Sequence, residues 1–150
     1  RSLGWNLLNN ENQILNSSDG SIAVVGVENW GASNRFPKYG DLDKAMKGSE
    51  DADVKILLTH DPSHWEKVVI PGNYDIDLSL SGHTHGFQFG IETKEIKWSP
   101  AKYMYKQWAG LYEDDEKLGR YIYVNRGLGS IGYPGRIGIL PEITFIELES

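Results

Sequence analysis

The chain contains no cysteine, and this absence removes two kinds of site. Disulfide bridges are excluded, and so are metal sites built on thiolate ligands. Any metal ion must therefore be held by nitrogen or oxygen atoms. The absence does not indicate whether the compartment is reducing or oxidising.

Long hydrophobic runs are also missing. The most apolar stretches, such as Ile56-Leu57-Leu58, are far shorter than the roughly 20 residues that a transmembrane helix needs. No basic-then-apolar leader opens the chain. We therefore expect a soluble segment without a membrane span, while the compartment of the full-length protein stays open.

An excess of positive charge is absent as well. The 15 Lys and Arg residues are outnumbered by 21 Asp and Glu residues, which gives a formal charge of -6 and does not favour a nucleic-acid partner. The 39% hydrophobic and 24% charged residues are typical of a folded protein. A length of 150 residues fits one domain.

The apolar segments that are present follow a strand–helix–strand order. Strands are predicted over Ser21–Val27, Val54–Thr59 and Ile76–Leu80, with helices beginning at Asp41 and at Pro62. The continuous apolarity of the second strand predicts that it is covered on both faces. This order favours parallel pairing and an α/β fold.

The rest of the chain is less regular. Phe87–Ile91 is predicted as a further strand, and residues 92–118 as a long loop with short helical turns. Tyr121–Val124 and Ile143–Leu148 are strong strand signals on both sides of a glycine-rich span, Gly127–Gly138.

Histidines follow two of the predicted strands, His60 after the second and His83 and His85 after the third. Ligands bind at the carboxyl ends of strands in α/β sheets, and imidazole is a common metal ligand. His83 and His85 point together if extended geometry continues past Gly82. A His-x-His pair alone is more often structural. His64 is expected to face solvent beside Glu66.

The context of these histidines resembles a known family. Leu57–Pro62 and Leu78–Gln88 are similar to the second half of the calcineurin-like metallophosphoesterases. The closing stretch, Asn125–Gly129 through Pro141–Thr144, resembles the bacterial YkuE-type branch of that superfamily.

The resemblance implies a fold, a site and an activity. The fold is an α/β β-sandwich flanked by helices in α-β-β-α layers, of which residues 1–150 form the carboxyl-terminal part. His60 and His83 bind one divalent ion (Mn, Fe or Zn) and His85 a second, and a metal-activated hydroxide attacks phosphorus. The substrate is a phosphorylated small molecule or a lipid-linked phosphodiester, with a phosphodiester or pyrophosphate linkage favoured. The resemblance also implies that the full-length protein is membrane-associated.

The first-half motifs of that family, Asp-x-His, Gly-Asp-x-x-Asp and Gly-Asn-His, do not occur here in the required order. Gly40-Asp41-Leu42-Asp43 is followed by Lys44, and Gly72-Asn73-Tyr74-Asp75 is predicted to be a turn. We therefore expect this segment alone to bind at most one metal, weakly, and to be inactive. One alternative is a non-catalytic module that binds a single zinc through the three histidines. Another is a structural domain with relic histidines.

Other side chains near these motifs are candidates for the site, and some of them have more than one interpretation. Asp61 either orients His60 or caps the helix that follows it. Arg126 is a candidate substrate ligand, Arg136 is expected to form surface ion pairs, and Phe87 narrows the space beside the metals. The aromatic residues of one irregular segment form either a lid or an anchor that pins it to the core. These residues are Trp98, Tyr103, Tyr105, Trp108 and Tyr112.

Overall fold

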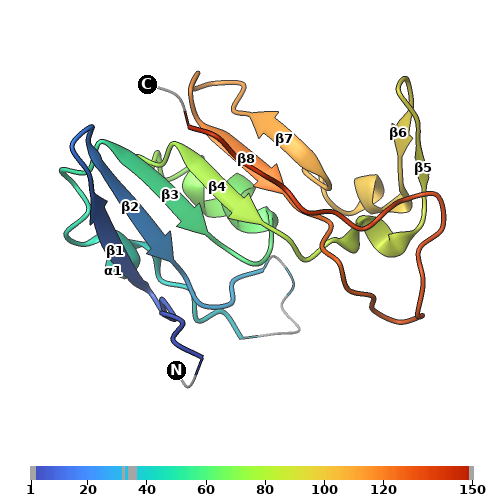
Figure 1. The fold of residues 1–150 in the computed structure, drawn as a ribbon, viewed down its shortest axis with the longest axis horizontal. Coiled ribbons are helices and arrows are strands. Elements are labelled where there is room, and N and C mark those ends of the chain that lie inside the picture. The colour runs from blue at the N-terminus through green and yellow to red at the C-terminus, as the bar shows by residue number, and fades with distance from the viewer. Residues whose placement is uncertain (1–2, 32, 34–36, 149–150) are drawn as a thin grey trace.

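The computed structural model describes residues 3–31, 33 and 37–148, and a mixed six-stranded sheet organises them in the order β1-β2-β3-β4-β8-β7 (Figure 1). The four central strands β2, β3, β4 and β8 pair in parallel, and the edge strands β1 and β7 pair antiparallel to their neighbours. The strands are β1 (Glu11–Asn16), β2 (Ser21–Gly26), β3 (Val54–Leu58), β4 (Leu78–Ser81), β7 (Gly110–Glu113) and β8 (Tyr121–Val124). A short hairpin of β5 (Ile91–Glu92) and β6 (Lys97–Trp98) lies apart from this sheet.

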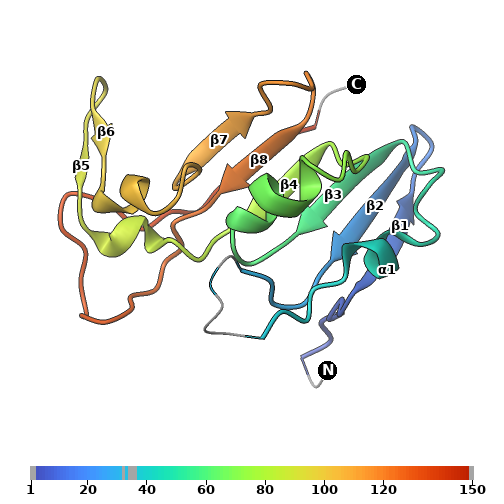
Figure 2. The ribbon, with the colours of Figure 1, turned by 180° about the vertical axis from the view of Figure 1, so that it is seen from behind.

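Two helical elements cover one face of the sheet (Figure 2). They are α1 (Leu42–Met46) and the π-helix η1 (Trp65–Val69). Asp41 caps α1 by accepting a hydrogen bond from the backbone N–H of Lys44 at 2.9 Å. The main core lies between these helices and the sheet, and its buried members are Ala23, Val25, Leu42, Ala45, Leu57, Trp65, Val69, Ile76, Ile122 and Val124.

The opposite face of the sheet is more open (Figure 1). Along β3, Lys55 and Leu57 are buried, whereas Leu58 on the other face is 39% exposed. The prediction that β3 is covered on both faces therefore holds for one face among the described residues. A strand with apolar side chains on both sides is suited to lie between two layers.

The predicted strands of the central sheet are confirmed, and so are both predicted helices and the parallel pairing. The chain is therefore a mixed sheet with few helices, compatible with the predicted α/β class. The turn predicted at Gly72–Asp75 is also present, with Asn73 in the left-handed region at φ 49°.

Two parts of the prediction are wrong, and a third is incomplete. Phe87–Ile91 is not one strand, because its first part belongs to the 3-10 helix η2 (His85–Gln88) and only Ile91 enters a strand, β5. Ile143–Leu148 has no strand partner among the described residues, and Phe145 is 88% exposed. Residues 92–118 contain the expected short helical turn, the 3-10 helix η3 (Pro100–Tyr103), but also the strands β6 and β7, which were not predicted.

No helix within the described ranges has the length and apolar character that crossing a bilayer requires.

Candidate metal centre

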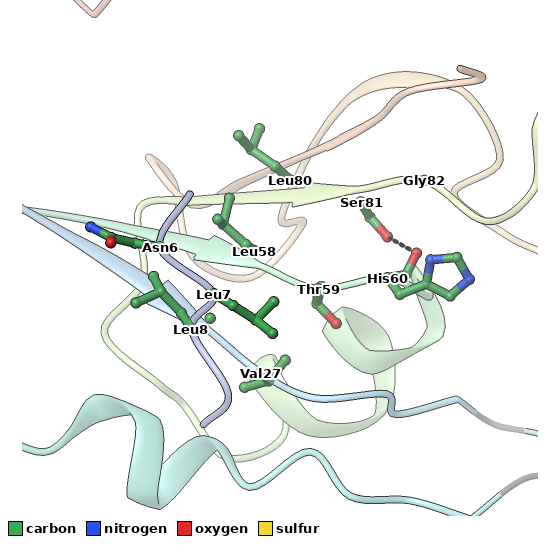
Figure 3. Close-up of a pocket in the computed structure, with 11 residues that line it drawn as sticks. Asn6, Leu7, Leu8, Val27, Leu58, Thr59, His60, Leu80, Ser81 and Gly82 are labelled. Atoms are coloured by element: carbon green, nitrogen blue, oxygen red, sulfur yellow. Dashed lines mark hydrogen bonds between the residues drawn. The ribbon is translucent and has the colours of Figure 1, made fainter. Parts of the chain in front are cut away.

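His60 and His83 come together because they follow neighbouring parallel strands. β3 and β4 pair in register, Leu58 opposite Leu80, so both chains leave the sheet at the same edge. Beyond the strands, the carbonyl oxygen of His60 accepts hydrogen bonds from the Gly82 N–H at 3.1 Å and the Ser81 hydroxyl at 3.0 Å (Figure 3). These contacts hold the segments that follow β3 and β4 side by side.

The facing nitrogen atoms of this pair are His60 Nε2 and His83 Nδ1, which lie 2.9 Å apart. The rings are 4.7 Å apart and meet edge to face. Burial lowers the pKa of His60, and His83 lowers it further, against an opposing effect of Asp61. A lowered pKa keeps the His60 imidazole neutral at pH 7, and the neutral form is the one that binds metals.

The turn after β4 departs from strand geometry. His83 has a φ of 67° and His85 a φ of 51°, and Phe87 and Gln88 are also in the left-handed region. Because extended geometry does not continue past Gly82, the condition for His83 and His85 to point together is not met. Left-handed residues other than glycine are uncommon, and a run of them marks a strained segment held by its surroundings.

His85 is not gathered with the other two imidazoles. The described residues contain no group of three or more His, Asp or Glu side chains that could hold one ion. The Nδ1 atom of His85 is nevertheless buried without a hydrogen-bond partner. Such an atom is expected to have a ligand or water in the functional protein.

These observations test whether the chain fits a metal ion. Two nitrogens bound to one ion at about 2.1 Å lie about 3.4 Å apart in tetrahedral geometry and about 3.0 Å apart at a right angle. His60 Nε2 and His83 Nδ1, which share a hydrogen bond of 2.9 Å, are therefore close to the spacing of two ligands of one ion. The unpartnered His85 nitrogen is a further available donor. The described residues thus fit part of a metal centre, and the single-zinc alternative, which needs three imidazoles on one ion, gains no support from this arrangement.

Asp61 has the capping role that the sequence offered, and its second carboxylate oxygen lies near His83. Its Oδ1 accepts a hydrogen bond from the Ser63 N–H at 2.8 Å, which caps the helical turn after Pro62. Its Oδ2 lies 3.8 Å from Nε2 of His83. The carboxylate therefore approaches His83 rather than the predicted His60.

The prediction that His64 faces solvent is wrong. The side chain is 1% exposed, its Nδ1 lies 3.0 Å from the Thr59 hydroxyl, and its ring lies 5.0 Å from that of Trp30. Burial lowers the pKa of His64 to about 4, against the opposing charge of Asp61. The helix turns His64 inward because the start of η1 packs against the sheet, and the sequence pattern did not reveal that side.

Arg126 lies behind the histidine turn and is already paired. It forms ion pairs with Glu92 and, at 2.7 Å, with Glu142. Burial would raise the pKa of Glu142, but hydrogen bonds from Tyr123, Arg126 and Thr144 lower it to about 2. Arg126 is thus fixed by carboxylates at neutral pH, and its contact with substrate stays a prediction.

Arg136 supports the glycine-rich span instead of forming surface ion pairs. Its guanidinium donates to the carbonyl oxygens of Arg126, Gly127 and Gly129, at 2.7, 3.0 and 2.8 Å. It also donates to the carbonyl of His85 at 3.3 Å. Arg136 therefore ties this span to the histidine turn.

Phe87 is 37% exposed at the histidine turn. The aromatic segment is anchored to a small second core by Trp108, which is 7% exposed, whereas Tyr103 is 74% exposed. The lid stays a prediction. Tyr105 belongs to this segment, and its contact with a histidine was not predicted from the sequence. Its hydroxyl lies 2.9 Å from Nε2 of His83.

A cavity of about 500 Å³ borders His60. It lies between residues 6–8 and the strand exits, and Figure 3 shows the His60 ring at its edge, turned away from Leu58 and Leu80. Its lining combines apolar side chains with the polar side chains of Asn6, Thr59, His60 and Ser81. The lining comprises Asn6, Leu7, Leu8, Gly26, Val27, Leu58, Thr59, His60, Leu80, Ser81 and Gly82.

Curated proteins with related sequences carry consistent names. The chain is 32% identical over 149 residues to the "Uncharacterized metallophosphoesterase YkuE" of Bacillus subtilis, and 35% identical over 131 residues to a "Transmembrane protein with metallophosphoesterase domain" of Danio rerio. It is 28% identical over 149 residues to "Phosphodiesterase YaeI" of Escherichia coli.

The chain belongs to the calcineurin-like metallophosphoesterase family. No family model and no solved structure matches it.

The metallophosphoesterase matches cover nearly all of this chain but only part of each relative. The Bacillus match covers 98% of the chain and 48% of the relative, and the Escherichia match covers 99% and 49%. The zebrafish match covers 85% of the chain and 28% of the relative. The chain therefore spans about half the length of the Bacillus and Escherichia relatives, and the family is not confined to bacteria.

Proposed function

We propose that the full-length protein containing this chain is a metal-dependent hydrolase of a phosphoester, with a phosphodiester or pyrophosphate linkage favoured. The observation that carries this proposal is the His60–His83 pair, whose facing nitrogens lie 2.9 Å apart at the exits of two parallel strands. Family membership supports the reaction class, and the name of the Escherichia relative includes phosphodiesterase.

In this proposal His60 and His83 hold one divalent ion, and His85 contributes to a second. The ions, of the Mn, Fe or Zn type, supply Lewis acidity at phosphorus and lower the pKa of the attacking water. His60 is suited to its part because its lowered pKa leaves it neutral. Arg126, held by Glu92 and Glu142, and Phe87 beside the turn are the proposed substrate contacts.

We further propose that residues 1–150 are the carboxyl-terminal half of an α-β-β-α sandwich. Coverage of about half of the Bacillus YkuE and Escherichia YaeI relatives supports this division. The second layer would pack on the face of the sheet that carries Leu58, and Ile143–Leu148 would join it as a strand. Ile143 and Phe145 are 84% and 88% exposed in the described structure, which is costly for apolar side chains without such a layer.

The remaining ligands, carboxylates in particular, would come from the first half of the protein. A phosphorylated small molecule or a lipid-linked phosphodiester is the proposed substrate. We also propose that the full-length protein is membrane-associated, because relatives from zebrafish and cattle are named transmembrane proteins.

The test is a set of substitutions in the full-length protein. His83→Ala is expected to remove one metal ion and at least about 100-fold of the hydrolysis rate, because a missing ligand both weakens binding and displaces the ion. Metal content is measured by elemental analysis, and the rate with an aryl phosphodiester and Mn²⁺.

Lys67→Ala, on the exposed side of η1, is the matched control and should retain both metal and rate. Unchanged metal content and rate in His83→Ala would refute the assignment.

A further inference from the structure

Two buried hydroxyl groups fasten the strained histidine turn to the aromatic segment, residues 98–112. The Thr84 hydroxyl donates to the carbonyl oxygen of Trp108 at 2.7 Å, and the Ser99 hydroxyl donates to that of Gly86 at 2.7 Å. Both hydroxyl-bearing residues are almost fully buried, at 3% and 0% exposed. The turn therefore owes its position to a segment that follows it in the chain.

Tyr105 is fixed within the same segment. Its backbone N–H donates to the carbonyl oxygen of Ala101 at 2.9 Å, and its side chain packs against the second core cluster. That cluster comprises Ala101, Trp108, Ala109 and Ile139. Packing against this cluster holds the Tyr105 ring in place. The centroids of the Tyr105 and His83 rings lie 5.6 Å apart, and the two rings meet edge to face.

The two nitrogens of His83 have different neighbours. Nδ1 faces His60, whereas Nε2 lies 2.9 Å from the Tyr105 hydroxyl. The nearest oxygen of Asp61 is 3.8 Å from Nε2, beyond hydrogen-bond distance. A neutral imidazole carries its proton on one nitrogen only, so Nδ1 offers a lone pair when the proton is on Nε2. In that tautomer the Tyr105 oxygen accepts a hydrogen bond from the Nε2–H group.

We propose that Tyr105 is a positioning residue that holds His83 in the tautomer with the proton on Nε2, which leaves Nδ1 free to bind metal. This inference rests on the proposed function, in which His83 is a ligand. It also gives a role to the aromatic segment: the segment carries the group that orients the ligand, as well as the two hydroxyl contacts that hold the turn.

The test compares Tyr105→Phe with the full-length wild-type protein. Phenylalanine keeps the ring that packs against the second core cluster and removes only the hydroxyl. In metal-free protein at pH 8, NMR of the imidazole nitrogens is expected to show a single Nε2–H tautomer for His83 in the wild type and a mixture in the variant. The signals of His83 are identified by their loss in His83→Ala. The dissociation constant for Mn²⁺ is expected to rise about tenfold in Tyr105→Phe.

Tyr103→Phe is the matched control, because Tyr103 lies two residues away and is 74% exposed. It should match the wild type in both measurements. If Tyr105→Phe keeps the wild-type tautomer and Mn²⁺ affinity, the positioning role is refuted while the proposed function stands. If the wild type binds no Mn²⁺ but the tautomer still changes in Tyr105→Phe, the positioning role stands and the metal-dependent function fails.

Discussion

At the scale of a single residue, burial keeps the side chain of His64 uncharged at neutral pH. The side chain is 1% exposed, and its pKa is lowered from 6.5 to about 4. In the unfolded chain the same imidazole takes up a proton near its ordinary pKa. The contribution of His64 to the free energy of unfolding is therefore fully present above pH 6.5, and it is lost as the pH falls from 6.5 towards 4.

We predict that His64→Asn flattens this part of the stability profile. Asparagine does not titrate, and its amide can still bond to the Thr59 hydroxyl. The wild-type full-length protein should lose about 3 kcal/mol of unfolding free energy across that pH interval through this group, and the variant should not. Urea denaturation at several pH values measures the difference. Equal slopes in the two proteins would contradict the burial argument.

At the scale of elements, the predictable parts of the chain are those whose sequence carries its own signal. β2, β3 and β8 are β-branched or aromatic runs that pair within one sheet, and they were predicted. Ile143–Leu148 has the same signal, but a strand also needs a partner, and none is described beside it. The sequence predicts the tendency of a segment and not the presence of its neighbour.

The candidate site divides in the same way. Strand ends and histidine spacing predicted that His60 and His83 would meet, because parallel strands share one edge. The left-handed turn could not be predicted, since contacts from residues 98–112 hold it. Tyr105 lies 22 residues after His83 in the chain, and only the fold brings the two together.

The glycine-rich span gives a test at this scale. Gly138 has a φ of 68°, and a Cβ atom there would lie 1.9 Å from the backbone oxygen of Gly90. We predict that Gly138→Ala destabilises the full-length protein by more than about 3 kcal/mol, because both the conformation and the contact exclude a side chain. Urea denaturation measures the loss.

Gly129→Ala is the matched control in the same span, because no atom lies within 4 Å of its Cβ position. Its effect should stay within about 0.5 kcal/mol. An equal loss of unfolding free energy in the two variants would contradict the prediction, because only Gly138 has the close contact with Gly90.

At the scale of the whole molecule, the balance of charge limits what this chain can do alone. Two dications need negative ligands to offset them, and no group of three or more ligand side chains is gathered within the described ranges. Neutral imidazoles bind metal but do not neutralise it. The chain is therefore expected to depend on carboxylates from the rest of its protein.

We predict that residues 1–150 alone bind at most one Mn²⁺, weakly, and hydrolyse an aryl phosphodiester at a rate near background. Equilibrium dialysis measures the bound metal, a colorimetric assay the rate, and circular dichroism confirms that the segment is folded. Turnover comparable to that of the full-length protein would refute this expectation.

The parallel order of the central strands also has a consequence for how the molecule forms. β2, β3, β4 and β8 pair side by side, yet each is separated from the next by a long stretch of chain. Each of these strand pairs forms only after a long loop has closed, and closing the loop costs entropy before the pair contributes any stabilising contacts. Formation of the sheet should therefore be slow. Until the sheet has formed, the apolar face of β3 that carries Leu58 can associate with other chains and aggregate. Early synthesis of a layer that covers this face would shorten its exposure.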